Sequence, residues 1–465
     1  MLFSSTTFLV LFLTGTLLVY YLIPPCLRWA RNLLLLGVSL VFYWWGEPKF
    51  VAVMAASVCM NYLFGLWVHY AKSRGRSVKP AVICTVFANL SILFVYKYLN
   101  FTLRNLKLLG LPVEVTNFVL PIGISFFTFQ AMSYVFDIAL GTGRVQKNPL
   151  NVGLYVALFP QLVAGPIVKY ETVADEILHR RENWADFAEG VRRFIIGVGK
   201  KVLLSNQMAV VADAAFGAAA PSAAFAWLGI FCYTLQIYYD FSGYSDMAIG
   251  LGRMFGFHFL ENFDYPYISR SFTEFWRRWH ISLGSWFRDY VYFPLGGSRA
   301  GAGRHVRNMF LVWLLTGIWH GANWTYVLWG LYCFAFIAGE KYLGLSRRLP
   351  RWGQHVYCVL VINFSFVIFR SDDLGHMARY FTALFGANGL TCTLAPFYFR
   401  EQLVYLLAAV LFAMPAAKWV EKKMAKSPVP ILTDTLYAAA LMGVFLVSAS
   451  CLVKGTYNPF IYFNF

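Results

Sequence analysis

The feature that most constrains this chain is a succession of apolar runs, each about 17 to 25 residues long, separated by short gaps that are basic or contain proline. A helix of that length crosses the hydrocarbon core of a bilayer. The 465 residues are 59% hydrophobic and only 13% charged. A soluble chain would have about a quarter of its residues charged and would show amphipathic helices or alternating strands. We therefore predict an all-α polytopic membrane protein.

The opening run, residues 8–23, is predicted to be a retained span. The first charged residue is Arg28, so the run lacks the basic region that precedes the apolar part of a signal peptide. The gap from Lys72 to Lys79 is the densest early basic loop and is predicted to be cytoplasmic. Counting back through two spans also places the turn at Arg28 in the cytoplasm and the N-terminus outside.

We expect about nine to twelve transmembrane helices. The predicted segments are 8–23, 32–45, 50–70, 80–98, 118–140, 223–257, 309–329 with a continuation to 337, 356–369, 403–419 and 436–453. Prolines and a glycine interrupt 150–170, which predicts a re-entrant segment, because broken backbone at membrane depth must be covered by protein or a water-filled cavity. The charged, amphipathic stretch 171–202 is expected to lie along the surface.

No repeat and no soluble domain is evident, so we predict one membrane-embedded domain, 1–465. It would comprise N-terminal helices (1–140), a core (150–330) and C-terminal helices (353–465).

The net charge of +17 reflects Lys and Arg residues in the gaps between spans. They are typical of topology determinants next to a lipid bilayer and do not indicate a nucleic-acid partner, although basic loops also attract phosphorylated or acidic donors. The eight cysteines are scattered without a Cys-x-x-Cys pair, which predicts neither a disulfide framework nor a metal site.

Two histidines ringed by tryptophan are the candidate functional residues. Ser271-Phe-Thr-Glu274 is a capping-box sequence, so a helix is predicted from there to about Tyr290, with His280 at the border of its aromatic stripe. The stripe consists of Trp276, Trp279, Leu283, Trp286 and Tyr290, and the opposite face of Arg277, Arg278, Ser282, Ser285, Arg288 and Asp289. This pattern favours a helix in the membrane interface.

His320 lies within the apolar run 309–329, where an ionisable side chain is a functional candidate. Gly321 and Ala322 should leave space beside its ring, and Asn323 could orient the ring or a carbonyl. A neutral imidazole suits the task of taking a proton from an attacking hydroxyl. Each histidine could equally be a core residue bonded to a carbonyl, and spacing alone does not decide between these readings.

Other polar positions carry weaker signals. Asp240 and Ser242 stand in an apolar stretch and should face an internal cavity or the interface. Gly296 and Gly297 beside Arg299 could approach a phosphate, although an ordinary turn is favoured. Because no Gly-x-Ser-x-Gly, His-Glu-x-x-His or P-loop motif is present, serine or metal hydrolysis is disfavoured.

Seven stretches in order resemble the membrane-bound O-acyltransferase family, within it the bacterial branch that acetylates alginate, peptidoglycan and cellulose. They are Leu120–Phe126, Phe159–Pro166, Asp240–Gly250, Glu274–Leu283, Arg288–Gly297, Trp319–Trp324 and Asn458–Phe463, and the start Met1–Ser5 is also similar. Ser298 departs from the pattern, which more often has asparagine there.

The resemblance implies a ring of tilted helices around a thin central region, with re-entrant and interfacial segments. It maps the family's essential histidine onto His320 and its second histidine onto His280. It also implies acetyl-coenzyme A as a cytoplasmic donor with no permanently bound cofactor, and a location in the bacterial inner membrane. The expected partner is a periplasmic, hydrolase-like (SGNH-type) acetyltransferase that modifies an exported polysaccharide.

We therefore expect His320 to activate the nucleophile and His280 either to assist it or to hold the thioester region. The residues expected to bind substrate are Asn323, Trp319, Trp279, Arg277, Arg278, Arg288, Asp240 and Ser242. Two alternatives remain at this point: transfer of D-alanine to teichoic acid, and a polytopic transporter, although the paired interrupted segments of a transporter are not found.

Overall fold

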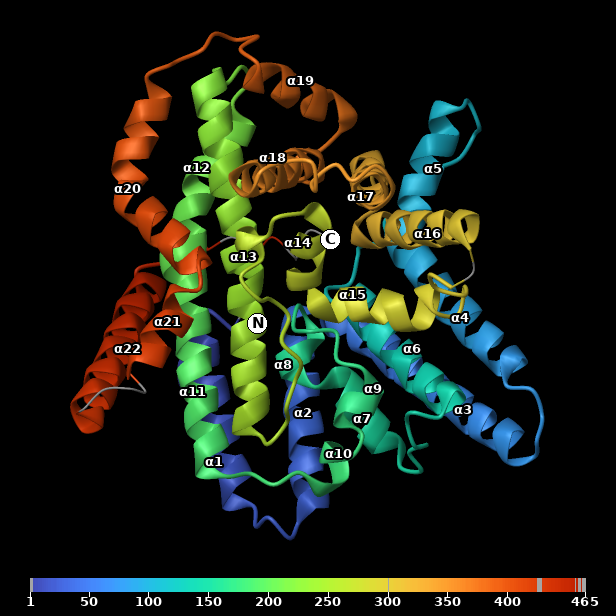
Figure 1. Cartoon of the computed structure of the whole chain (residues 1–465). Coiled ribbons are helices and arrows are strands. Elements are labelled where there is room, and N and C mark those ends of the chain that lie inside the picture. The colour runs from blue at the N-terminus through green and yellow to red at the C-terminus, as the bar shows by residue number, and fades with distance from the viewer. Residues whose placement is uncertain (1–2, 300, 425–428, 456, 459–460, 462–465) are drawn as a thin grey trace. The chain divides into compact units, whose positions relative to one another are not determined.

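The computed structural model describes residues 3–299, 301–424, 429–455, 457–458 and 461. Throughout these residues the regular structure is helical and no β-strand occurs (Figure 1). The prediction of an all-α chain is therefore confirmed. The resembling stretches at 1–5 and 458–463 lie only partly within the described residues.

The chain divides into two compact units, Met1–Phe194 with Ser245–Leu260, and Ile195–Tyr244 with Glu261–Phe465. The first unit contains η1 (Thr7–Leu13), α1 (Thr14–Leu22), α2 (Arg28–Gly46), η2 (Pro48–Phe50), α3 (Val51–Ser73), α4 (Lys79–Leu93), η3 (Phe94–Tyr98), α5 (Leu99–Leu108), α6 (Ile124–Leu140), α7 (Pro149–Ala157), α8 (Phe159–Leu162), α9 (Tyr170–Val173) and α10 (Glu176–His179). Two helices contribute residues to both units, α11 (Trp184–Gly199) and α13 (Ala223–Met254).

Both histidine segments belong to the second unit. Its helices are η4 (Lys200–Ser205), α12 (Asn206–Gly217), η5 (Pro266–Ile268), α14 (Phe272–Arg278), α15 (Ile281–Phe287), η6 (Arg288–Tyr292), α16 (Ala302–His320), α17 (Trp324–Tyr342), α18 (Arg351–Arg370), α19 (Leu374–Leu384), α20 (Leu394–Ala413), α21 (Ala416–Met424) and α22 (Pro430–Val453).

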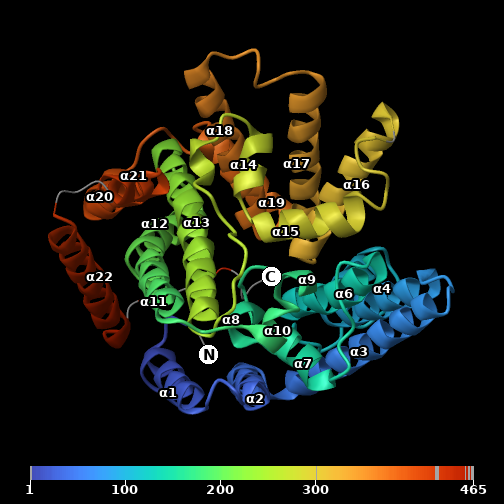
Figure 2. The ribbon, with the colours of Figure 1, turned by 60° about the horizontal axis from the view of Figure 1, so that its bottom comes forward.

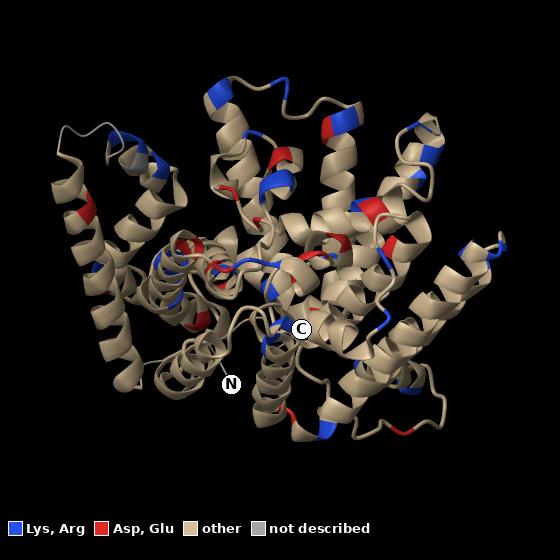
Figure 3. Ribbon diagram, turned by 90° about the horizontal axis from the view of Figure 1, so that it is seen from below, with Lys and Arg blue, Asp and Glu red and all other residues tan. Residues whose placement is uncertain are grey.

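Among the described residues, six helices are long and apolar enough to cross a membrane: Pro48–Ser73, Lys79–Leu108, Trp184–Gly217, Arg351–Arg370, Leu394–Ala413 and Pro430–Val453. Thr7–Leu22 and Ile124–Leu140 are shorter apolar helices. Charged residues gather near helix ends and in connecting loops, between long uncharged stretches of ribbon (Figure 3). The chain is therefore a multi-pass membrane protein, and the count of nine to twelve spans stays a prediction.

The stretch 171–202 differs from its prediction as a surface helix. After two short helices the chain enters one continuous helix of 34 residues, Trp184–Gly217, which is apolar enough to span a bilayer. Its charged residues are Asp186, Glu189, Arg192 and Arg193 in the first three turns, Lys200 and Lys201 near the middle, and Asp213 near the end. These charges made the stretch look amphipathic, although the helix as a whole is apolar enough to span a bilayer.

The predicted interruption of 150–170 is confirmed. Helix α7 ends at Ala157, the four residues of α8 follow, and the backbone from Gly165 to Lys169 is irregular. Every residue from 151 to 170 is buried. Protein therefore covers this broken backbone, as burial away from water requires.

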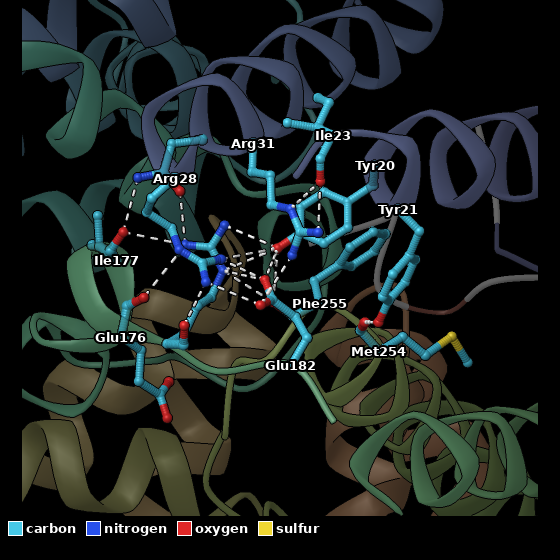
Figure 4. Close-up of polar contacts among 12 residues, drawn as sticks. Tyr20, Tyr21, Ile23, Arg28, Arg31, Glu176, Ile177, Glu182, Met254 and Phe255 are labelled. Carbon is cyan, nitrogen blue, oxygen red and sulfur yellow. Dashed lines mark hydrogen bonds and ion pairs between the residues drawn. The ribbon is translucent and has the colours of Figure 1, made fainter. Parts of the chain in front are cut away.

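A buried ionic cluster ties together distant parts of the first unit (Figure 4). The carboxylate of Glu182 accepts hydrogen bonds from Arg28 and from the hydroxyl of Tyr20. A nitrogen of Arg31 lies 3.0 Å from Glu182 Oε2, and Arg180 Nε lies 3.7 Å from Oε1. Three guanidinium groups thus surround one carboxylate.

The arginines of the same cluster also donate hydrogen bonds to backbone carbonyl groups. Arg31 donates to the carbonyl of Ile23 at 2.7 and 2.9 Å, and Arg180 donates to the carbonyl of Phe255 at 3.0 Å. Burial raises the pKa of the Glu182 carboxyl, but the hydrogen bonds from Arg28 and Tyr20 outweigh it and hold that pKa at about 2. Glu182 is therefore ionised at every physiological pH.

Candidate functional site

The segment that carries His280 begins as predicted and ends differently. Ser271 Oγ accepts the amide N–H of Glu274 at 3.0 Å, and Glu274 Oε2 accepts the N–H of Arg270, so the capping box starts helix α14. The helix does not continue to Tyr290. It ends at Arg278, and α15 begins at Ile281 after a break in which His280 is left-handed, with φ +47° and ψ +50°.

An extended segment from another part of the sequence causes this break. The amide of Ile281 donates to the carbonyl of Asn262 at 3.0 Å, and the amide of Asp264 donates to the carbonyl of Arg278 at 3.0 Å. These backbone bonds replace the helical bonds that a continuous helix would make. A left-handed conformation is costly for a residue other than glycine, and such strain is concentrated at functional sites.

His280 is buried, with 3% of its surface exposed. Its Nδ1 lies 3.2 Å from Asn262 Oδ1, and its ring packs edge-on against Phe241, with ring centroids 4.6 Å apart. Burial lowers the pKa of its imidazole from 6.5 to about 3. The ring is therefore neutral in the folded protein at physiological pH.

His320 is the last residue of α16, which corrects the prediction of an uninterrupted apolar span at 309–329. The chain turns at Gly321 and re-enters helix at Trp324, so α16 and α17 form a hairpin. Their backbones touch at two glycines. A Cβ on Gly317 would lie 2.4 Å from the carbonyl oxygen of Tyr326, and one on Gly330 would lie 2.5 Å from that of Trp313.

Aromatic rings enclose His320, which is 5% exposed. Ring centroids of Trp329, Trp319 and Phe369 lie 4.9, 5.0 and 5.1 Å from the imidazole, all edge-on. The space expected beside Gly321 is filled, because a Cβ there would lie 2.2 Å from the ring of Tyr326.

Trp319 connects the two histidines. Its ring centroid lies 5.0 Å from that of His320 and 6.3 Å from that of His280. The two imidazoles therefore share an aromatic neighbour, although 40 residues separate them in the sequence. Helix α14 reaches this position by packing on α15, α17 and α18 (Figure 2).

Trp279 and Asn323, both expected to bind substrate, have structural contacts. Trp279 is buried among aromatic rings, with Phe263 and Phe275 centroids 5.0 and 5.3 Å away. Asn323 is the N-cap of α17, where its Oδ1 accepts the N–H of Thr325, and its amide donates to the carbonyl of Asp372 at 2.6 Å. Its binding role stays a prediction.

The three predicted phosphate-attracting arginines differ in their surroundings. Arg278 pairs with Glu274 and Asp264 at 3.1 Å each, and Arg288 pairs with Asp289 at 2.7 Å. Arg277 is exposed. Arg277 is therefore the one whose charge is best placed to meet an anion from solution.

Asp240 and Ser242 are both buried on α13. Lys201 Nζ lies 2.6 Å from Asp240 Oδ1, and the amide of Ile461 donates to Oδ2 at 2.9 Å. Asp240 thus holds the described part of the C-terminal segment against the second unit. The hydroxyl of Ser242 is buried and has no hydrogen-bond partner among the residues that the structure describes.

Two residues that shape the site carried no signal in the sequence. Asn262 contacts the histidine directly, as described above. Glu340 of α17 is buried, and its carboxylate accepts the amide N–H groups of Phe272 and Thr273 at 2.6 and 2.8 Å. Glu340 therefore caps α14 and fixes the segment that leads to His280. Spacing along the chain could not relate either residue to that segment.

In the described ranges no three His, Cys, Asp or Glu side chains are grouped so that they could hold a metal ion. The site instead offers two buried nitrogen bases in an aromatic, low-dielectric surrounding. Such a surrounding suits proton transfer to or from a reactant.

Comparison with known proteins agrees with this chemistry. Residues 143–370, which include both histidines, match the membrane-bound O-acyltransferase family. The chain is 39% identical to the "probable alginate O-acetylase" of Pseudomonas putida over 100% of both chains. It is 30% identical to the peptidoglycan O-acetyltransferase of Helicobacter pylori over 100% of this chain and 98% of that one.

A further relative is the teichoic acid D-alanyltransferase of Bacillus subtilis, which is 31% identical over 54% of this chain and 68% of that protein. The resemblance seen in the sequence motifs is confirmed. The chain belongs to the membrane-bound O-acyltransferase family and is an O-acyltransferase.

Proposed function

We propose that this enzyme takes an acetyl group from a cytoplasmic thioester donor and passes it across the bacterial inner membrane for O-acetylation of an exported polysaccharide. The observation that carries the proposal is the pair of buried imidazoles that share Trp319. Full-length similarity to an alginate O-acetylase and a peptidoglycan O-acetyltransferase supports acetyl as the acyl group and a polysaccharide as the acceptor.

In this mechanism His320 is the general base. It takes the proton of the nucleophile's hydroxyl as that oxygen attacks the thioester carbonyl and the new carbon–oxygen bond forms. As the carbon–sulfur bond breaks, the protonated His320 gives this proton to the departing sulfur, which leaves as a thiol. His320 is the last residue of α16, and the carbonyl end of a helix stabilises positive charge that develops on a base there. The aromatic rings around it exclude water that would hydrolyse the thioester.

We further propose acetyl-coenzyme A as the donor and a periplasmic hydrolase-like acetyltransferase as the partner. A coenzyme A donor is anionic and cannot cross the bilayer, whereas an exported acceptor lies outside. The transfer site must therefore be reached from both sides. The exposed guanidinium of Arg277 is available to attract the donor's phosphates.

The test is transfer of radiolabelled acetyl from acetyl-coenzyme A to exported glycan or partner in membranes that contain the protein. Wild type should transfer label and His320→Ala should not. His305→Ala is the matched control, because His305 is a buried histidine on the same helix that bonds to Tyr342 at 2.6 Å. Both variants must elute as folded protein. Label transfer by folded His320→Ala would refute the role of His320.

D-alanyl transfer is the second candidate, supported by the partial similarity to a teichoic acid D-alanyltransferase. The same membranes supplied with a D-alanyl thioester on a carrier protein separate the two donors. Acetylation without D-alanylation supports the first proposal. The transporter alternative has no support once the chain belongs to an enzyme family.

A further inference from the structure

The ring of His280 can hold its proton on either nitrogen, and its surroundings select one. Asn262 Oδ1 accepts the backbone N–H of Ser282 at 3.2 Å. A backbone N–H can only donate, so the atom of Asn262 that faces it must be the amide oxygen and not the amide nitrogen. This contact fixes the orientation of the Asn262 side chain.

His280 Nδ1 lies 3.2 Å from that same oxygen. An unprotonated Nδ1 would set two lone pairs against each other, whereas Nδ1–H makes a hydrogen bond. The hydroxyl of Ser282 is a poor alternative donor to Nδ1, because it lies 3.5 Å from Nδ1 but 2.9 Å from Asn262 Oδ1. The geometry therefore favours the tautomer with the proton on Nδ1.

In this tautomer Nε2 carries a lone pair and no proton. Nε2 is buried, and no hydrogen-bond partner for it occurs among the residues that the structure describes. A buried acceptor without a partner destabilises the fold, so its retention calls for an explanation. The ring of His280 packs against Phe241 and Trp319, and Trp319 also packs on His320.

We propose that Asn262 is a positioning residue that fixes His280 as the Nδ1–H tautomer, so that His280 presents Nε2 as a hydrogen-bond acceptor to a bound reactant. Because Nε2 accepts and does not donate, it orients the O–H of the incoming nucleophile and does not polarise the thioester carbonyl. Its role is thus distinct from that of His320, which takes the proton. This assignment rests on the proposed acyl transfer.

The backbone also supports this role for Asn262. Its carbonyl oxygen accepts the N–H of Ile281 at 3.0 Å. The main chain and the side chain of Asn262 therefore both bond to the turn that bears His280. The left-handed conformation of His280 is the cost of this arrangement. A histidine with only a packing role would need neither the strain nor the oriented amide.

The first experiment is ¹⁵N NMR of the full-length protein labelled at histidine. The His280 signal is identified as the one missing from His280→Gln. We expect the Nδ1–H tautomer in wild type and a mixture of tautomers in Asn262→Leu. Wild type with the proton on Nε2 would overturn the proposal, and this readout does not depend on enzyme activity.

The second experiment measures kcat and KM for acetyl-coenzyme A in three variants. Asn262→Leu should lower kcat by about tenfold to about 100-fold with little change in KM, since a misplaced proton removes part of the acid–base contribution. Asn262→Asp keeps an acceptor oxygen and should retain most of the activity. Ser282→Ala, the matched control, removes another donor to the same oxygen and should leave the tautomer unchanged.

The outcomes separate this inference from the proposed function. If membranes with the wild-type protein transfer no labelled acetyl, the proposed function is refuted, whereas the tautomer result remains valid. Wild-type kcat in folded Asn262→Leu refutes the positioning role while acetyl transfer remains. If Asn262→Leu does not fold, the wild-type tautomer and the activity of Asn262→Asp decide; an inactive but folded Asn262→Asp with the Nδ1–H tautomer also counts against it.

Discussion

Replacing Glu182 by glutamine should lower the free energy of unfolding more than removing any exposed charge in the chain, because it leaves three arginines without their carboxylate. The magnitude follows from the carboxyl group's pKa, which falls from 4.5 to about 2 in the folded protein. Each pKa unit corresponds to about 1.4 kcal/mol, so the ionised carboxylate contributes about 3 kcal/mol. Breaking a buried ion pair costs about 3–5 kcal/mol in general, which agrees.

The sign of the pH dependence follows from the same numbers. The folded-state pKa lies below the unfolded value, so the contribution is fully present above pH 4.5 and is lost as pH falls toward 2. Glu182→Gln has no carboxyl group to protonate, so the difference in stability between wild type and variant should shrink over that range and should be constant above it.

The assay is equilibrium unfolding in mixed detergent micelles, followed by tryptophan fluorescence. Asp175→Asn is the matched control, because Asp175 is 88% exposed and pairs with an exposed histidine at 2.9 Å. Exposed pairs contribute about 0–1 kcal/mol. If Glu182→Gln lost no more stability than Asp175→Asn, the cluster would not hold the first unit together, and the reasoning from burial and geometry would fail.

Three further predictions concern the second unit. Gly330→Ala should cost about 1–3 kcal/mol and reduce acetyl transfer, since its Cβ would meet the Trp313 carbonyl 2.5 Å away, whereas Gly303→Ala on α16, with nothing within 4 Å, should be neutral in both assays. Glu340→Gln should cost about 1–3 kcal/mol in micelle unfolding, because an amide nitrogen then faces an N–H at the start of α14. Burial lowers the pKa of His280 from 6.5 to about 3, so protonation of the unfolded chain lowers the stability of wild type as pH falls below 6.5. At pH 5 the free energy of unfolding of wild type should have fallen by about 2 kcal/mol relative to that of His280→Gln. Equal slopes of stability against pH in the two proteins would refute burial of the ring.

The helical class followed from the length of the apolar runs, which can be read along the sequence without knowledge of any tertiary contact. The start of α14 was also predictable, because the capping box is a local signal between Ser271 and Glu274. The break at His280 was not, since the residues around it keep a helical period. Backbone bonds to Asn262 and Asp264 impose the break, and no local pattern reports contacts from that separate segment.

The turn after His320 was hidden for a different reason. Tryptophans and leucines continue on both sides of it, so the run reads as one span. The available signal was Asn323 as an N-cap before Trp324, which the prediction assigned to orienting the imidazole. Close approach at Gly317 and Gly330 then folds the two helices onto each other, and only the structure shows which glycines meet.

Both histidines lie where a helix is interrupted, and the two interruptions differ in what they offer. His320 ends α16, where the helix carbonyls stabilise a cation, so it is suited to gain a proton. His280 precedes α15 and is buried with its Nδ1 already engaged by Asn262, so it is suited to stay neutral and to accept a hydrogen bond. If the helices continued through these positions, His320 would not lie at a helix end and His280 would not be bonded to Asn262. The breaks thus assign different tasks to two identical side chains.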